Sequence, residues 1–264
     1  MMNAILICRQ CKKSCGRKRK SIRTKSIFSH SHASLFSWMK YIHRFSQGLH
    51  MRQVDMMLDD ISNSSATLSK MSMKLRSVCV RSMRRLREKR GQKVGGLNIR
   101  VHIDESKFRH RRKYARGRFG GAWRRKSWVF GMVEILPSRK PVLRLVDKRD
   151  KTTLLPIIEK HVKRGSIIHS DEWRAYSALS ERGYQHHTVN HSINFVNPST
   201  GVHTQNIERA WANFKREVWR LCANRSEKAL KNHLIYIEWT YWLGRRHRRG
   251  ILERLLHDIS QFYN

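Results

Sequence analysis

The chain has 264 residues, 39% of them hydrophobic, which is enough to bury a sizeable core as one large domain or two small ones. It carries 56 Lys and Arg against 19 Asp and Glu, and its formal net charge of +37 is spread over both halves. Such a charge attracts polyanions, so nucleic acid is the expected partner. Charge alone favours a ribosomal or chromatin protein that only binds, because basic composition says nothing about catalysis.

The sequence excludes some locations. No run of residues is long and apolar enough for a transmembrane helix, so we expect no membrane partner. The first residues lack the pattern of a secretory signal, and the five cysteines do not form a secreted disulfide framework. We therefore expect an intracellular protein. In a eukaryote it would be nuclear, since the basic run at residues 17–20 could serve nuclear import.

Residues 1–32 form a basic segment with one C-x-x-C pair, Cys8 and Cys11. Structural zinc usually takes four ligands, so a single pair is a weak signal. Other donors close by in the sequence are Cys15, His30 and His32. We do not expect a zinc site at Cys8 and Cys11.

Residues 33–90 have the periodicity of helices. The residues that the spacing places on one face of the first helix are Leu35, Phe36, Met39, Ile42 and Phe45. Two further helices are predicted on either side of a polar break at residues 59–65, which is helix-turn-helix spacing. That pattern suits a DNA-reading role, although any helical hairpin gives it. The charged stretch 82–96 resembles a linker.

From residue 98 the period becomes that of β-strands. In NIRVHIDESKF, Val101 and Ile103 fall on one face while His102 and Asp104 fall on the other. Two strands joined by a turn at residues 137–140 follow, then a helix at 151–162, the strands SIIHSD and HHTVNHS, a long helix from NIERAW, and helical segments to the end. This order predicts an α/β, ribonuclease-H-like mixed sheet flanked by helices.

Acidic residues are rare, and three of them stand at the ends of predicted elements. Asp104 ends the first strand, Asp171 ends SIIHSD, and Glu208 lies in the first turns of the long helix. Side chains at strand ends can converge on one crevice. Lys215 shares a helix face with Glu208 and Trp211 through i, i+3, i+7 spacing, so it can reach the same place.

Clustered carboxylates suit divalent cations such as Mg²⁺ or Mn²⁺, and two such ions can activate the attacking oxygen and stabilise the leaving one in phosphodiester chemistry. Each residue also has a plainer interpretation. Asp104 could be an exposed strand end, Asp171 a helix cap, and Glu208 a charge that favours the helix dipole. The residues alone leave both interpretations open.

Three stretches carry a family resemblance: VHIDESKF, GSIIHSDEWRAYSAL and GYQHHTVNHSINFVNPSTGVHTQNIERAWANFKR. They resemble the DDE transposases of the Merlin superfamily and their bacterial insertion-sequence relatives with the ISXO2-like transposase domain, over residues 97–238. The resemblance implies a ribonuclease-H-like fold and metal-dependent cleavage and strand transfer of double-stranded DNA at transposon ends. Water would free a 3′ hydroxyl, which would then attack target DNA.

The family motifs fall on Asp104, Asp171, Glu208 and Lys215. Some bacterial members use Asn in the third acidic role, and Gln205 stands there in this chain, which favours Glu208. Family members often begin with a zinc ribbon of two cysteine pairs. Cys8 and Cys11 therefore resemble a remnant of it, and we expect the start of a full-length transposase to be missing.

The sequence thus predicts four parts: residues 1–32 as a basic segment, 33–90 as a helical DNA-binding region, 97–238 as the catalytic domain, and 239–264 as a helical extension. We expect His187 and His191 to be buried histidines rather than parts of the crevice, and the tryptophans of EWTYWL to be core. A homo-oligomer on DNA stays open. The alternatives are an inactive or domesticated transposase-derived DNA-binding protein and, less well supported by the triad, a basic ribosomal or chromatin protein.

Overall fold

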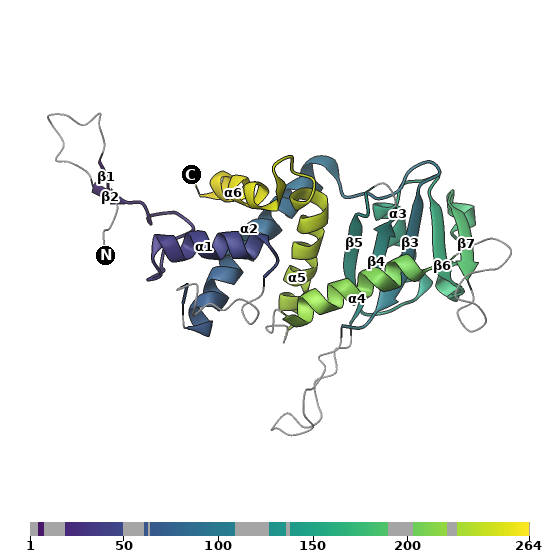
Figure 1. Cartoon of the computed structure of the whole chain (residues 1–264). Helices are drawn as coiled ribbons and strands as arrows, with labels where there is room; N and C mark the ends of the chain where they lie inside the picture. The colour runs from purple at the N-terminus through teal and green to yellow at the C-terminus, as the bar shows by residue number, and fades with distance from the viewer. Residues whose placement is uncertain are drawn as a thin grey trace, which may run out of the picture. The chain divides into compact units, whose positions relative to one another are not determined.

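The computed structural model describes residues 5–7, 19–49, 61–62, 64–108, 127–135, 138–189, 203–220 and 226–263 (Figure 1). The chain divides into two compact units. One comprises Met1–Cys79 with His247–Asn264, and the other comprises Val80–Arg246. No helix within the described ranges is long and apolar enough to cross a membrane.

The first unit is mainly helical. Its elements are β1 (Ile5–Ile7), β2 (Arg19–Ser21), α1 (Leu35–Ser46), the first half of α2 (Ser65–Arg90) and α6 (Gly250–Phe262). Helix α1 begins where the Ser34 hydroxyl accepts a hydrogen bond from the backbone N–H of Ser37, as is usual for an N-cap serine. It packs against α6, and the Tyr41 hydroxyl donates to the backbone carbonyl of Leu68 in α2.

The buried face of α1 differs from the predicted one. The large buried side chains are Trp38, Tyr41, Ile42 and Phe45. Phe36 and Met39, which we expected on that face, are 68% and 53% exposed. The prediction is wrong for these two residues because it left out Trp38 and Tyr41, whose burial removes more apolar surface from water.

Helix α2 extends further than expected. The first helix of the expected helix-turn-helix pair lies mostly outside the described residues, so that motif stays a prediction. The second continues to Arg90, and the predicted linker is therefore wrong over residues 82–90. Val78, Cys79 and Met83 are fully buried and prolong its apolar face. The helix ends at Gly91, whose φ of +66° is a left-handed conformation that glycine adopts without strain.

The second unit contains a five-stranded mixed sheet. Its strands are β3 (Arg100–Ser106), β4 (Trp128–Glu134), β5 (Pro141–Val146), β6 (Ile167–Asp171) and β7 (Gln185–Val189), in the order β5-β4-β3-β6-β7. The β3–β4 and β4–β5 pairs are antiparallel, and the β3–β6 and β6–β7 pairs are parallel. The predicted α/β class and element order are confirmed, and the sheet is compatible with a ribonuclease-H-like fold.

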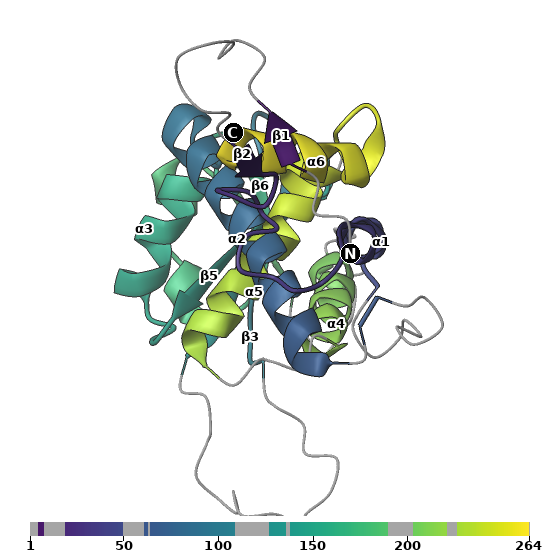
Figure 2. The same ribbon diagram turned by 90° about the vertical axis from the view of Figure 1, so that its left-hand side faces the viewer.

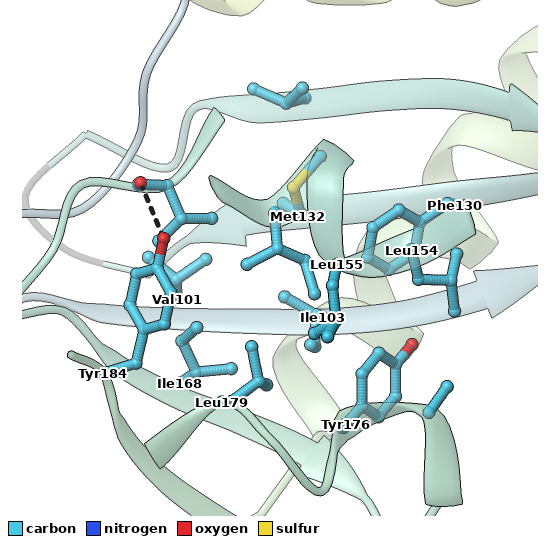
Figure 3. Close-up of a cluster of buried hydrophobic side chains, with 14 of the residues drawn as sticks. Val101, Ile103, Phe130, Met132, Leu154, Leu155, Ile168, Tyr176, Leu179 and Tyr184 are labelled. Carbon is cyan, nitrogen blue, oxygen red and sulfur yellow. Dashed lines mark hydrogen bonds between the residues drawn. The ribbon is translucent and has the colours of Figure 1, made fainter. Parts of the chain in front are cut away.

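Helices cover both faces of this sheet (Figures 1 and 2). One face carries α3 (Lys151–His161) with the short turns η1 (Arg174–Tyr176) and η2 (Ser180–Arg182); the other carries α4 (Gln205–Arg220) and α5 (Glu227–Trp239), which runs into the π-helical turn Thr240–Gly244. Figure 3 shows Val101 and Ile103 of β3 packed with Leu154 and Leu155 of α3. The predicted sidedness of β3 is thereby confirmed for its apolar residues.

A buried carboxylate joins three elements of the second unit. The side chain of Glu238 in α5 is fully buried. It forms ion pairs with Arg87 of α2 and with Arg144 of β5, the latter at 2.8 Å. It also accepts the backbone N–H of Leu143 at 2.8 Å. Because a buried charge needs such partners, this group fixes α5 against β5 and the end of α2.

Candidate active site

The register of two parallel strands puts the first two candidate carboxylates side by side. The paired residues of β3 and β6 are Arg100 with Ile167, Val101 with Ile168, and His102 with His169. The same offset, carried two residues further, sets Asp104 level with Asp171. Side chains alternate along a strand, so both carboxylates lie on the face where the rings of His102 and His169 stack at 4.9 Å.

Asp104 is largely buried and firmly held. The indole Nε1–H of Trp211 in α4 donates to its Oδ2 at 2.8 Å, and the backbone N–H of Glu105 donates to its Oδ1 at 2.7 Å. Burial raises the pKa of Asp104 to about 6; the two hydrogen bonds oppose this shift, and the charges of Asp171 and Glu208 add to it. The charges of both other candidate carboxylates therefore reach Asp104.

A glycine allows α4 to approach the sheet. Gly131 of β4 pairs with Asp104, and a Cβ atom at this position would lie 2.5 Å from the Trp211 ring. That distance is shorter than any ordinary contact, so only glycine leaves room for the indole. Trp211 can then reach across to Asp104, which brings the first turns of α4 over the end of β3.

The other two candidates lie on α4. Glu208 is exposed, and the hydroxyl of Thr204 donates to its Oε1 at 3.2 Å. Lys215 is half-buried; burial lowers its pKa, while the charge of Asp104 raises it. Lys215 is thus close enough to Asp104 for the carboxylate to favour the ammonium form, in keeping with the predicted helix face.

The sequence reasoning missed a second buried acid. Glu105 accepts a hydrogen bond from the Tyr176 hydroxyl and lies 3.8 Å from the guanidinium of Arg149. Burial raises the pKa of Glu105 to about 7, and the charges of Asp104 and Asp171 contribute to the rise. Strand alternation places Glu105 on the apolar face of β3 with Val101 and Ile103, and nothing in the sequence indicates the partners that it finds there.

Histidines lie beside the carboxylates. Burial lowers the pKa of His102 to about 3 and that of His169 to about 4, so both rings are neutral at pH 7. His203, just before α4, packs edge-on against His102 at 5.5 Å. His187 is exposed rather than buried, which corrects the prediction: it lies on β7, the edge strand, with its ring 5.8 Å from His169. His191 lies outside the described residues.

Among the described residues, no three His, Cys, Asp or Glu side chains are already arranged to hold a metal ion. The cysteine pair Cys8 and Cys11 lies outside these ranges, as does Cys15. The donor chemistry nevertheless fits a hard cation, because carboxylate oxygens suit such ions and the charges of Asp171 and Glu208 raise the pKa of Asp104, which a bound divalent ion would offset.

Comparison with known proteins decides the family. Residues 94–240, more than half of the chain, match the sequence model described as the ISXO2-like transposase domain. The chain belongs to this family. It is also similar to a Haemophilus influenzae protein described as an uncharacterized transposase-like protein, with 32% identity over 74 residues. The match covers 28% of this chain and 58% of that relative's length.

The ISXO2-like domain contains the whole five-stranded sheet and the helices that cover it. It begins at the bridge that Val94 forms with Val162 and ends just after α5. The four candidate residues Asp104, Asp171, Glu208 and Lys215 all lie within it. The family predicted from the sequence is confirmed.

Proposed function

We propose that this chain is a transposase that cleaves DNA at transposon ends and joins the freed 3′ ends to target DNA in a metal-dependent reaction. Membership of the ISXO2-like family supports a role in transposition. One observation supports the residue assignment: Asp104 and Asp171 are level on neighbouring parallel strands, and the charges of Asp171 and Glu208 both raise the pKa of Asp104.

In this proposal, Asp104, Asp171 and Glu208 hold Mg²⁺ or Mn²⁺. When bound, such ions lower the pKa of an attacking water and offset the charge of the phosphate. Trp211 orients the Asp104 carboxylate through its 2.8 Å hydrogen bond. Lys215 contacts a phosphate oxygen as a compact positive charge.

The chemistry exchanges one oxygen for another at phosphorus. In the first step a water oxygen bonds to phosphorus while the bond to the 3′ oxygen breaks, and that oxygen leaves as a 3′ hydroxyl. In the second step this hydroxyl attacks a phosphate of target DNA and displaces its 3′ oxygen in turn. Neither step needs a covalent enzyme intermediate, and the net charge of +37 provides the attraction that holds both DNA segments.

Cleavage by matched variants tests this function. DNA that carries the sequences flanking the gene is incubated with wild type, Glu208→Gln and Glu217→Gln, each in Mg²⁺, Mn²⁺ or EDTA. Glu217 lies nine residues after Glu208 on the same helix, which at about 3.6 residues per turn places it on the opposite side, so its variant makes the same chemical change away from the candidate site. We expect metal-dependent cleavage by wild type and Glu217→Gln and none by Glu208→Gln. Cleavage in EDTA, or full activity of Glu208→Gln, contradicts the mechanism.

A further inference from the structure

An exposed tryptophan next to the candidate active site is held in place by its neighbours. Trp173, two residues after Asp171, is 41% exposed. Its backbone N–H donates to the Asp171 carboxylate at 3.2 Å, and its indole N–H donates to the backbone carbonyl of Arg149 at 2.7 Å. Exposure of so large a ring gains nothing for folding, whereas these two anchors fix its orientation.

The same tryptophan forms one side of a cation–aromatic stack. The guanidinium carbon of Arg149 lies 4.9 Å from the ring centroid of Trp173 and 3.9 Å from that of Trp128 at the start of β4. The ammonium of Lys107, just after β3, lies 4.4 Å from the centroid of the Trp128 ring. Two indoles and two cations thus form one group, which we call the Trp–Arg stack.

Two members of the stack contact acidic residues at the ends of β3 and β6. Arg149 approaches the Glu105 carboxylate at 3.8 Å, and Glu105 directly follows Asp104. Trp173 hydrogen-bonds to Asp171. Trp173 lies two residues after Asp171, so a nucleotide whose phosphate is bound there through a cation would have its base near the exposed indole.

The chemistry of the stack suits a nucleic-acid strand. Arg and Lys attract the phosphates, and every base has a flat face that can stack on an aromatic ring. Inside a duplex these faces are covered by neighbouring base pairs, so only an unpaired base can use the platform. We propose that Trp173 stacks an unpaired base of the DNA strand next to the scissile phosphate, an inference that rests on the proposed function.

Binding of two DNA probes tests this platform without requiring cleavage. One probe is a short blunt duplex, and the other is the same duplex with a single-stranded overhang carrying a fluorescent adenine analogue at its first unpaired position. Both are titrated in EDTA with wild type, Trp173→Ala and Trp173→Phe. We expect Trp173→Ala to weaken binding of the overhang probe about ten-fold and to lose the fluorescence change of stacking, with blunt-duplex binding unchanged. Trp173→Phe should keep most of both signals.

Trp242→Ala is the matched control. Trp242 has similar contacts: its indole N–H donates to the backbone carbonyl of Pro141, and the ammonium of Lys140 lies 4.8 Å from its ring centroid. Pro141 begins β5, whereas Trp128 pairs with the residue that ends β5, so Trp242 lies away from the Trp–Arg stack. The Trp242→Ala variant should bind both probes as wild type does. Equal weakening of both probes by Trp173→Ala, or an unchanged overhang affinity, overturns the platform. The binding titrations contain no metal, so they test the platform alone. The proposed function is tested separately by the cleavage assay in Mg²⁺ or Mn²⁺, and a failure there leaves the binding result standing.

Discussion

At the scale of single residues, Asp104 combines two opposing environments. It accepts hydrogen bonds from Trp211 and from a backbone N–H, which favour the carboxylate, yet it is largely buried and faces two other acids. Burial outweighs the hydrogen bonds, since its pKa rises to about 6. A folded protein that keeps a carboxylate in such a place without a cation loses stability, which is more often a feature of functional sites than of structural ones.

This balance predicts a pH-dependent effect of Asp104→Asn in the metal-free protein. The folded-state pKa of about 6 exceeds the ordinary 3.8, so the free energy of unfolding falls as pH rises between these values, and the loss is complete above the higher one. The raised pKa costs the folded protein about 3 kcal/mol at most, and Asp104→Asn removes this cost. The variant also loses one hydrogen bond, which offsets about 1 kcal/mol of that gain in the free energy of unfolding. Urea unfolding should show the variant about 1–2 kcal/mol more stable at pH ~8 and no more stable at pH ~4. An equal gain at both values would show that ionisation is not the cause.

At the scale of elements, the sequence predicts the positions of helices and strands along the chain better than the contacts between them. Alternation in β3 and the helical spacing of α3 and α4 are local patterns, so the strands and helices appear where expected. The buried face of α1 depends on what packs against it, and the continuation of α2 through a charged stretch depends on tertiary burial of its apolar side. Neither quantity is present in a short window of sequence.

The candidate site divides in the same way. Asp104, Asp171 and Glu208 could be proposed because strand ends and helix starts can be predicted from periodicity. The contact of Trp211 with Asp104 and that of the Trp173 indole with Arg149 could not, since they join residues that are distant in sequence. Glu105 was missed because β3 is covered on both faces, so alternation did not separate inward from outward side chains.

The ion group around Glu238 gives a prediction at the same scale. Glu238→Gln leaves Arg87 and Arg144 without a charged partner, so the free energy of unfolding should fall by about 3 kcal/mol. Glu253→Gln removes an exposed pair with Arg249 and should cost less than about 0.5 kcal/mol. Chemical denaturation of both variants measures the difference, and similar losses would show that the buried group does not join the elements.

At the scale of the whole molecule, charge dominates. The net charge of +37 predicts that the logarithm of DNA affinity falls linearly and steeply with the logarithm of salt concentration, since each neutralised phosphate releases counterions. Asp104→Asn should leave this slope unchanged and bind as tightly as wild type or slightly tighter, because it removes a negative charge near a phosphate. Fluorescence anisotropy at several salt concentrations measures both quantities. Salt-independent binding would mean that the basic surface is not the DNA-binding surface.

The joint binding of a cation by three carboxylates is the central claim, and a Mn²⁺ titration followed by electron paramagnetic resonance tests it most directly. Wild type is compared with Asp104→Asn, Asp171→Asn and Glu208→Gln, and with Glu181→Gln, an exposed acid of η2, as the charge control. Each of the three site variants should bind Mn²⁺ at least about ten-fold more weakly, because loss of even an outer partner of a metal ligand has that effect. Glu181→Gln should bind as wild type does. Unchanged Mn²⁺ affinity in any of the three site variants would contradict the assignment of that residue as a metal ligand.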